Sequence, residues 1–173
     1  MSVSLTRGPA AGLVTAECTL TLCICTFKLR NMNDTSIAQA CHCLALRQAA
    51  RFVTQLYERH LAPVGVTPAQ FSIMANLTRQ PGLLMSELAD ALVMDRTTLL
   101  RALKPLQRDG FVATAASEHD TRAHALSLTK LGERTFAEAK VAWQAAQDEF
   151  ETRFGRDRAK ALRDELFSVT AER

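Results

Sequence analysis

Positively charged side chains gather in one stretch of the chain, between Asp95 and Arg108. The stretch holds four basic residues against one acid, a local charge of +3: Arg96, Arg101, Lys104 and Arg108. A guanidinium group can bind phosphate oxygens, or pair with O6 and N7 of a guanine and so discriminate bases by roughly 1–3 kcal/mol. Basic residues clustered on one short element therefore indicate a surface that binds a polyanion such as a nucleic acid.

A helix is predicted to carry these charges. Asp95 is a typical N-cap, because its carboxylate can accept the free backbone N–H groups of Thr97 and Thr98. Apolar residues recur at helical spacing and would face the core: Leu99, Leu103 and Leu106. Pro105 should remove the bond to the Arg101 carbonyl and bend the last turns.

A shorter amphipathic helix precedes the basic one. It spans Ser86–Leu92, with Ser86 as its expected N-cap, and three residues separate it from the basic helix. Two short helices around a tight turn, the second one basic, are typical of a helix-turn-helix.

Two strand-like segments follow the basic helix. Asp109-Gly110 is a turn signal, and the strands are expected over 111–115 and 123–128, on either side of a charged loop. Two strands in this position would form a wing. Thr129 should then cap a long helix with Glu133 in its first turn.

In this order and spacing, the motifs resemble the MarR family of winged-helix regulators over about residues 41–170. The segments that carry the resemblance are Ser86-Glu87-Leu88-Ala89, Asp95-Arg96-Thr97-Thr98-Leu99 with Arg101 and Leu103, Asp109-Gly110-Phe111-Val112, Asp120-x-Arg122, and Leu128-Thr129-x-x-Gly132. The resemblance implies a mainly α fold with a small β-hairpin wing: a winged helix-turn-helix domain plus N- and C-terminal dimerisation helices.

The resemblance also divides the chain. Residues 1–33 would be an extension and residues 34–173 a MarR-type domain, with the winged helix over about 67–129 and dimerisation helices over about 37–61 and 130–170. The extension has no clear helical or strand period. We expect it to be disordered or untranslated, and in the second case translation would start at Met32.

Apolar stripes at helical spacing mark both terminal regions. The first contains Leu46, Ala50, Val53, Tyr57 and Leu61, and the second Phe136, Ala139, Trp143, Ala146 and Phe150, followed after a break at Gly155 by Ala159, Leu162, Leu166 and Val169. The stripes could close a monomeric core or pair with a second copy. We favour a homodimer, because two recognition helices can read two half-sites of DNA.

The resemblance places the recognition helix in the major groove of double-stranded DNA. Its expected contact residues are Arg96, Thr97, Thr98, Arg101 and Lys104. Arg101 is the expected base contact, whereas the two threonines would contact a thymine methyl or a phosphate. Lys104 and Arg108 would contact phosphates or remain solvated.

The wing would add a contact in the minor groove. Arg122 resembles the family residue that enters this groove, and Asp120 resembles its positioning partner, which pairs with an arginine of the domain. For each of these charges, a solvated surface residue is the alternative interpretation.

Cys43 is the candidate redox-sensing residue. It begins the first helix where the organic-hydroperoxide-sensing branch of the MarR family carries its reactive cysteine, and Tyr57 matches a tyrosine that caps the oxidised sulfur there. Arg47 replaces a second tyrosine and could lower the thiol pKa. A buried, inert cysteine is the alternative. Cys41-His42-Cys43 lacks the Cys-x-x-Cys spacing of a tight zinc site, so no metal is expected.

A small aromatic acid is the alternative effector, bound in a cleft between the dimer helices and the winged domain. Arg51, His60 and Phe71 could line such a cleft, although the sequence defines no pocket. The prediction is therefore a repressor of a pseudo-palindromic operator, released by a small ligand or by thiol oxidation.

Other classes of protein fit the sequence less well. The motifs G-x-S-x-G, P-loop, H-E-x-x-H and G-x-G-x-x-G are absent, and neither an enzyme nor a cofactor is expected. No run of eighteen apolar residues occurs, which argues against a membrane span, and we expect a cytoplasmic protein. A helical protein-interaction scaffold without specific DNA binding is the alternative function. It would leave the basic helix and Asp120-x-Arg122 without a role.

Overall fold

The structure of the chain is a computed structural model that describes residues 38–116 and 124–171. The chain forms two compact units, residues 1–49 and residues 50–173. The second unit contains all the elements from α3 to α7.

The described part of the first unit is helical, with a break at Cys41. Helix α2 (His42–Leu61) begins at this break and continues into the second unit. The Cys41 carbonyl oxygen accepts a hydrogen bond from the Ala45 N–H (N···O 3.0 Å), and the Cys41 sulfur accepts one from the Leu44 N–H (3.4 Å). The sequence predicted an uninterrupted helix here. Cys41 instead satisfies two N–H groups of a first turn, so a new helix starts at this point.

The predicted end of α2 and start of the next helix are confirmed. A short 3₁₀ helix, η1 (Ala62–Val64), leads to Gly65, whose φ of 73° closes the turn. Helix α3 (Pro68–Arg79) begins after Thr67, whose hydroxyl accepts a hydrogen bond from the Gln70 N–H. The Gln70 side chain in turn accepts one from the Thr67 N–H. This reciprocal capping box fixes the start of α3.

The prediction of Ser86 as an N-cap is wrong. Helix α4 (Met85–Ala91) already starts one residue before Ser86, directly after strand β1 (Leu83–Leu84). The carboxylate of Glu87 accepts a hydrogen bond from the Leu84 N–H (2.8 Å). The first-turn glutamate therefore satisfies the N–H of the residue that precedes the helix, as the glutamate of a capping box does.

The predicted hairpin is present and has a third strand beside it. Strands β2 (Val112–Ala116) and β3 (His124–Leu128) pair antiparallel along their whole length. Strand β1 pairs Leu83 with Leu126, which gives the order β1-β3-β2. The sequence did not predict β1, because a strand of two residues has no period and its pairing partner is distant in the chain.

Three more helices complete the second unit: α5 (Arg96–Arg108), α6 (Lys130–Phe154) and α7 (Arg156–Ala171). Thr129 caps α6 as predicted, by accepting a hydrogen bond from the Gly132 N–H (3.0 Å). Gly155, with φ of 94°, separates α6 from α7, as predicted from its position. No helix formed by the described residues has both the length and the hydropathy of a membrane span.

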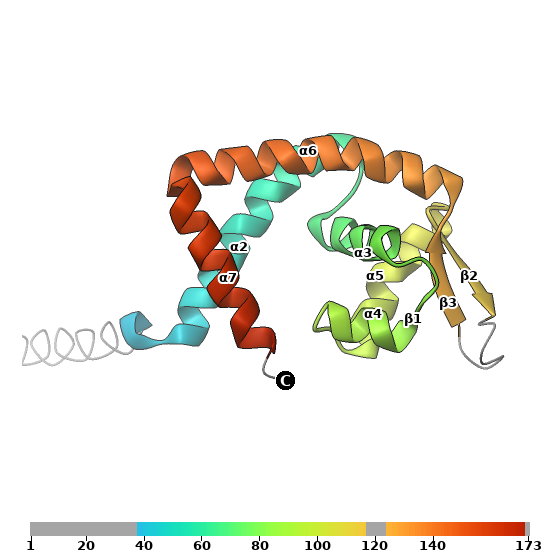
Figure 1. The fold of residues 1–173 in the computed structure, drawn as a ribbon, viewed down its shortest axis with the longest axis horizontal. Coiled ribbons are helices and arrows are strands. Elements are labelled where there is room, and N and C mark those ends of the chain that lie inside the picture. Colours follow the sequence, from blue (N-terminus) through green and yellow to red (C-terminus); the bar gives the residue numbers. More distant parts are fainter. Residues whose placement is uncertain (1–37, 117–123, 172–173) are drawn as a thin grey trace, which may run out of the picture. The chain divides into compact units, whose positions relative to one another are not determined.

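The core of the second unit lies where α3, α4 and α5 pack together, against the sheet and α6 (Figure 1). Its fully buried side chains include Leu61, Ile73, Met74, Leu77, Leu88, Leu99, Leu103, Leu106 and Leu126. Phe71 of α3 stacks on Phe136 and Trp143 of α6, with ring centroids 5.3 and 5.7 Å apart. This aromatic stack fastens α3 to α6.

The predicted stripes on the terminal helices are only partly buried. In the second unit, Leu56 and Leu61 are the fully buried residues of α2, and the sequence had not placed Leu56 on the stripe. Leu46 and Ala50 are exposed instead. On α7 only Ala159 is buried, and the remaining apolar residues of its stripe face solvent.

Candidate nucleic-acid interface

Helix α5 has a buried face and an exposed face. The buried face holds the predicted leucines, none more than 1% exposed: Leu99, Leu103 and Leu106. The exposed face holds all the residues of α5 predicted to contact DNA: Arg96, Thr97, Thr98, Arg101 and Lys104. The leucines fix the rotation of the helix, so its basic residues face solvent as a DNA contact requires.

Asp95 caps α5 and restricts what Thr98 can do. The Asp95 carboxylate accepts hydrogen bonds from the Thr98 N–H (2.9 Å) and from the Thr98 hydroxyl (2.6 Å). These bonds hold the pKa of Asp95 below its usual value. The Thr98 proton is already donated, so Thr97 is the better candidate for donation to a phosphate.

The basic residues of α5 differ in their partners. Arg108 binds its neighbour Asp109 through two hydrogen bonds, of 2.8 and 3.2 Å. This pairing lowers the pKa of Asp109 and raises the pKa of Arg108. Arg96, Arg101 and Lys104 make no ion pair with any described residue. The positive charge available to a phosphate therefore lies on the first three turns of α5.

A strained turn joins α4 to α5. The Met94 N–H donates to the Ala89 carbonyl (2.9 Å), and the Val93 N–H donates to the Asp90 carbonyl (3.1 Å). Val93 has φ of 53° and is the sole non-glycine residue with positive φ in the described ranges. A β-branched side chain disfavours this backbone region, so strain is held where the angle between the two helices is set.

One side-chain hydrogen bond links α5 to the wing. The Gln107 amide Nε2 donates to the Thr114 hydroxyl of β2 at 2.8 Å, and both side chains are exposed. The sequence gave no sign of this contact, which ties two elements predicted to bind DNA. The predicted wing-tip residues Asp120 and Arg122 lie outside the described residues.

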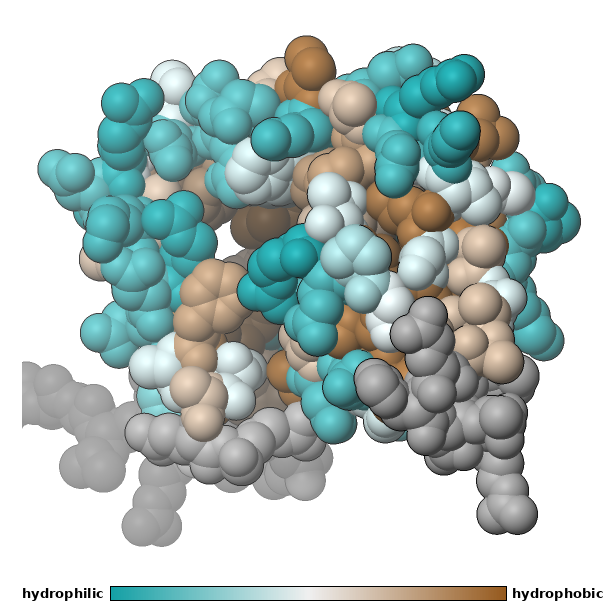
Figure 2. All heavy atoms as spheres, turned by 45° about the vertical axis from the view of Figure 1, so that its right-hand side comes forward, coloured by the Kyte–Doolittle hydropathy of each residue, from teal (hydrophilic) through white to brown (hydrophobic). Residues whose placement is uncertain are grey.

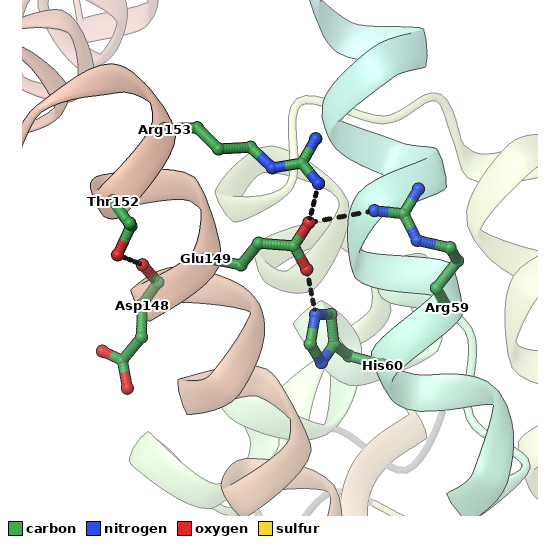
Figure 3. A network of polar contacts seen from close by, with 6 residues as sticks. All are labelled: Arg59, His60, Asp148, Glu149, Thr152 and Arg153. Carbon is green, nitrogen blue, oxygen red and sulfur yellow. Dashed lines mark hydrogen bonds and ion pairs between the residues drawn. The ribbon is translucent and has the colours of Figure 1, made fainter.

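A carboxylate on α6 gathers three basic side chains from α2 and α6 (Figure 3). Glu149 lies 3.2 Å from Arg59, 2.6 Å from Arg153 and 2.6 Å from the Nε2 atom of His60. The hydrogen bond from His60 is the main cause that lowers the pKa of Glu149, and the two arginines lower it further. The cluster joins the end of α2 to α6.

The cluster changes the interpretation of the effector cleft. His60, a predicted lining residue of the cleft, bonds to Glu149, and Phe71 is buried in the aromatic stack. Sequence reasoning missed the cluster because α2 and α6 are about ninety residues apart in the chain. Only the four-residue spacing of Glu149 and Arg153 was visible.

Known proteins share this sequence pattern and fold. The MarR family model matches residues 64–123. The chain is 31% identical to the transcriptional repressor CouR, solved bound to a 23-mer DNA duplex, with a TM-score of 0.71 over 77% of this chain and 94% of CouR. The chain belongs to the MarR family. This is a family of transcriptional regulators and not of enzymes, and the predicted fold class is confirmed, with three strands in the wing instead of two.

Other known transcriptional regulators also match this chain. The M. tuberculosis regulator MosR, solved in complex with DNA, is 33% identical, with a TM-score of 0.68 over 76% of this chain and 95% of MosR. The organic hydroperoxide resistance transcriptional regulator of Bacillus subtilis is 28% identical over 90 residues, 52% of this chain and 61% of that protein. The chain spans about three-fifths of the length of three curated relatives that it matches.

The two candidate redox residues of this MarR protein lie in different environments. Cys43 is a free, exposed cysteine in the first unit, so the alternative of a buried cysteine is wrong for the single chain. Tyr57, in the second unit, is half-buried, and burial raises its pKa, with Glu151 adding to the effect and Arg163 opposing it. The Tyr57 phenol therefore stays protonated and can donate a hydrogen bond.

Proposed function

We propose that this MarR protein is a homodimeric, cytoplasmic repressor that binds a pseudo-palindromic DNA operator. Helix α5 of each protomer lies in the major groove of one half-site, and the wing reaches the adjacent minor groove. A small ligand or oxidation of a thiol releases the protein from the DNA.

The observation that carries this proposal is the exposed basic face of α5. Its cations at Arg96, Arg101 and Lys104 have no acidic partner among the described residues, while the opposite face is locked into the core. Unpaired cations on a rigid helix are suited to phosphates, and an arginine among them is suited to a guanine. The DNA complexes of CouR and MosR support the same use of the fold.

An apolar face on α7 supports the homodimer. The exposed apolar residues that share this face at helical spacing are Leu162, Leu166 and Val169. Contiguous exposed apolar surface is typical of an interaction site, and a second copy would remove it from water. A dimer would also bring two copies of α5 to two half-sites of an operator.

A DNA titration tests the proposed function. The duplex is the promoter region of the protein's own gene, and affinity is measured by fluorescence anisotropy at one stated salt concentration. Arg101→Ala should weaken binding by about tenfold or more, since it removes a base contact. Arg134→Ala, an exposed arginine of α6, should leave the affinity unchanged. Equal losses for both variants, or wild-type binding no tighter than to an unrelated duplex, would contradict the proposal.

The same titration tests the wing. Arg122→Ala should weaken binding by about tenfold or more if the side chain enters the minor groove. An unchanged affinity would refute this role while leaving the role of α5 standing.

Two effector classes have support. The Bacillus relative is named for organic hydroperoxide resistance, and Cys43 is exposed to such an oxidant. When an organic hydroperoxide oxidises a cysteine, the thiol becomes a sulfenic acid, and the hydroperoxide becomes an alcohol. CouR has also been solved with p-coumaroyl-CoA, which supports an aromatic acid or its thioester as the alternative.

Oxidation of the bound complex separates these effectors. Cumene hydroperoxide should release wild-type protein from DNA, and Cys43→Ser should remain bound. Cys41→Ser is the matched control and should be released like the wild type, because its thiol is the partly buried one. Wild-type binding that is indifferent to the oxidant but weakened by an aromatic acid would assign the ligand mechanism instead.

A further inference from the structure

We propose that Leu100 reads a thymine in the operator by contacting its 5-methyl group in the major groove. The inference rests on the proposed function, because it requires α5 to lie in that groove. It adds an apolar reader to a set of contacts that was otherwise polar or charged.

Leu100 is not a core residue. It is 40% exposed, whereas the other apolar residues of α5 are buried or half-buried: Leu99, Ala102, Leu103, Pro105 and Leu106. Leu100 belongs neither to the core cluster nor to the partly buried side chains packed against it. Leu100 therefore contributes less to the core of the second unit than the buried leucines of α5 do.

Exposed apolar side chains also occur elsewhere, as the separate brown areas of Figure 2 show. A single exposed leucine carries little meaning on its own. The surroundings distinguish Leu100. It lies four residues after Arg96, three after Thr97 and four before Lys104, and residues at these spacings are neighbours on a helix surface.

The unpaired cations on either side of Leu100 indicate its partner. Arg96 and Lys104 are complementary to phosphates, which flank the base edges along a groove. An apolar side chain held between phosphate contacts faces those edges. The 5-methyl group of thymine is the apolar group that a base presents in the major groove, so thymine is the base that a leucine can recognise there.

The test removes only the methyl group from the DNA. A binding site is first selected from a random duplex pool with the wild-type protein. Each thymine of the selected site is then replaced by deoxyuridine, in both half-sites at once, and the affinities of wild type and Leu100→Ala are compared at one salt concentration. At one thymine, the replacement should weaken DNA binding by the wild-type protein about fourfold per half-site, which is the factor for burial of one methyl group. The affinity of Leu100→Ala should not change there.

The control is Val141→Ala, which truncates an exposed apolar residue of α6 and should respond to deoxyuridine like the wild type. Melting curves establish that Leu100→Ala is folded, as expected for an exposed position. Selection of a clear site with no thymine that distinguishes wild type from Leu100→Ala would overturn the role of Leu100 alone. Selection of no site at all would overturn the proposed function together with it.

Discussion

At the scale of single residues, Val93 is held in a backbone conformation that its side chain disfavours. Its φ is 53°, and its side chain is 48% exposed, so little packing offsets the strain. Val93→Gly should relieve a strain of about 1–3 kcal/mol. Glycine also gives the unfolded chain more conformational freedom, which lowers the free energy of unfolding by about 0.4–1 kcal/mol. At the middle of the two ranges the net stabilisation is about 1.3 kcal/mol, which should raise Tm by about 3–5 °C in a thermal melt.

The control for Val93 is a valine in ordinary helical backbone. Val141 is also exposed, but it lies inside α6, where glycine is unfavourable by about 0.5–1 kcal/mol relative to alanine. Val141→Gly should therefore lower the Tm. A lower Tm for Val93→Gly as well would mean that the turn gains nothing from relief of its φ angle.

At the scale of elements, local signals could be predicted from the sequence and long-range ones could not. The caps at Asp95 and Thr129 depend on residues within three positions, and the structure bears them out. Strand β1 and the Glu149 cluster depend on partners more than forty residues away, and both were missed. Gly132 was part of a sequence motif, but the physical reason for a glycine at this position is seen only in the structure. A Cβ there would clash with the Phe111 carbonyl oxygen.

The features of the candidate interface also differ in how far they could be predicted from the sequence. The helical period of the leucines was enough to predict which side chains of α5 face outward. The ion pair of Arg108 with Asp109 and the bond from Gln107 to Thr114 depend on side-chain conformations that composition does not determine.

Thr129 couples two elements, and this leads to a prediction. Its hydroxyl accepts from the Gly132 N–H at the start of α6 and donates to the Gly110 carbonyl after α5, at 2.6 Å. Thr129→Ala removes both bonds and should cost about 1–2 kcal/mol, seen as a fall in Tm of about 2–8 °C. Thr129→Ser keeps the hydroxyl and should restore most of the loss. Equal losses in the two variants would show that the threonine methyl, and not the hydroxyl, is what matters.

The Glu149 cluster should make the contact between α2 and α6 sensitive to acid. The folded protein lowers the pKa of Glu149, so the stability from its charge is present above the ordinary pKa of about 4.3. That stability is lost as the pH falls through the lowered, folded-state pKa. Glu149→Gln should therefore melt below the wild type at pH 7, and the difference should vanish in more acidic solution. Glu138→Gln, an exposed site on the same helix, should show no such pH-dependent difference.

At the scale of the whole molecule, the proposed dimer can be tested through the salt dependence of DNA binding. Each phosphate contact contributes about 0.9 to the slope of log affinity against log salt concentration. Lys104→Met removes one charge per protomer and keeps the length of the side chain. If two protomers bind one operator, the magnitude of the slope should decrease by about 1.8. If one protomer binds, it should decrease by about 0.9. Lys140→Met, an exposed lysine of α6, should leave the slope unchanged. An unchanged slope for Lys104→Met would remove this lysine from the DNA interface, because a charge that meets no phosphate releases no counterion.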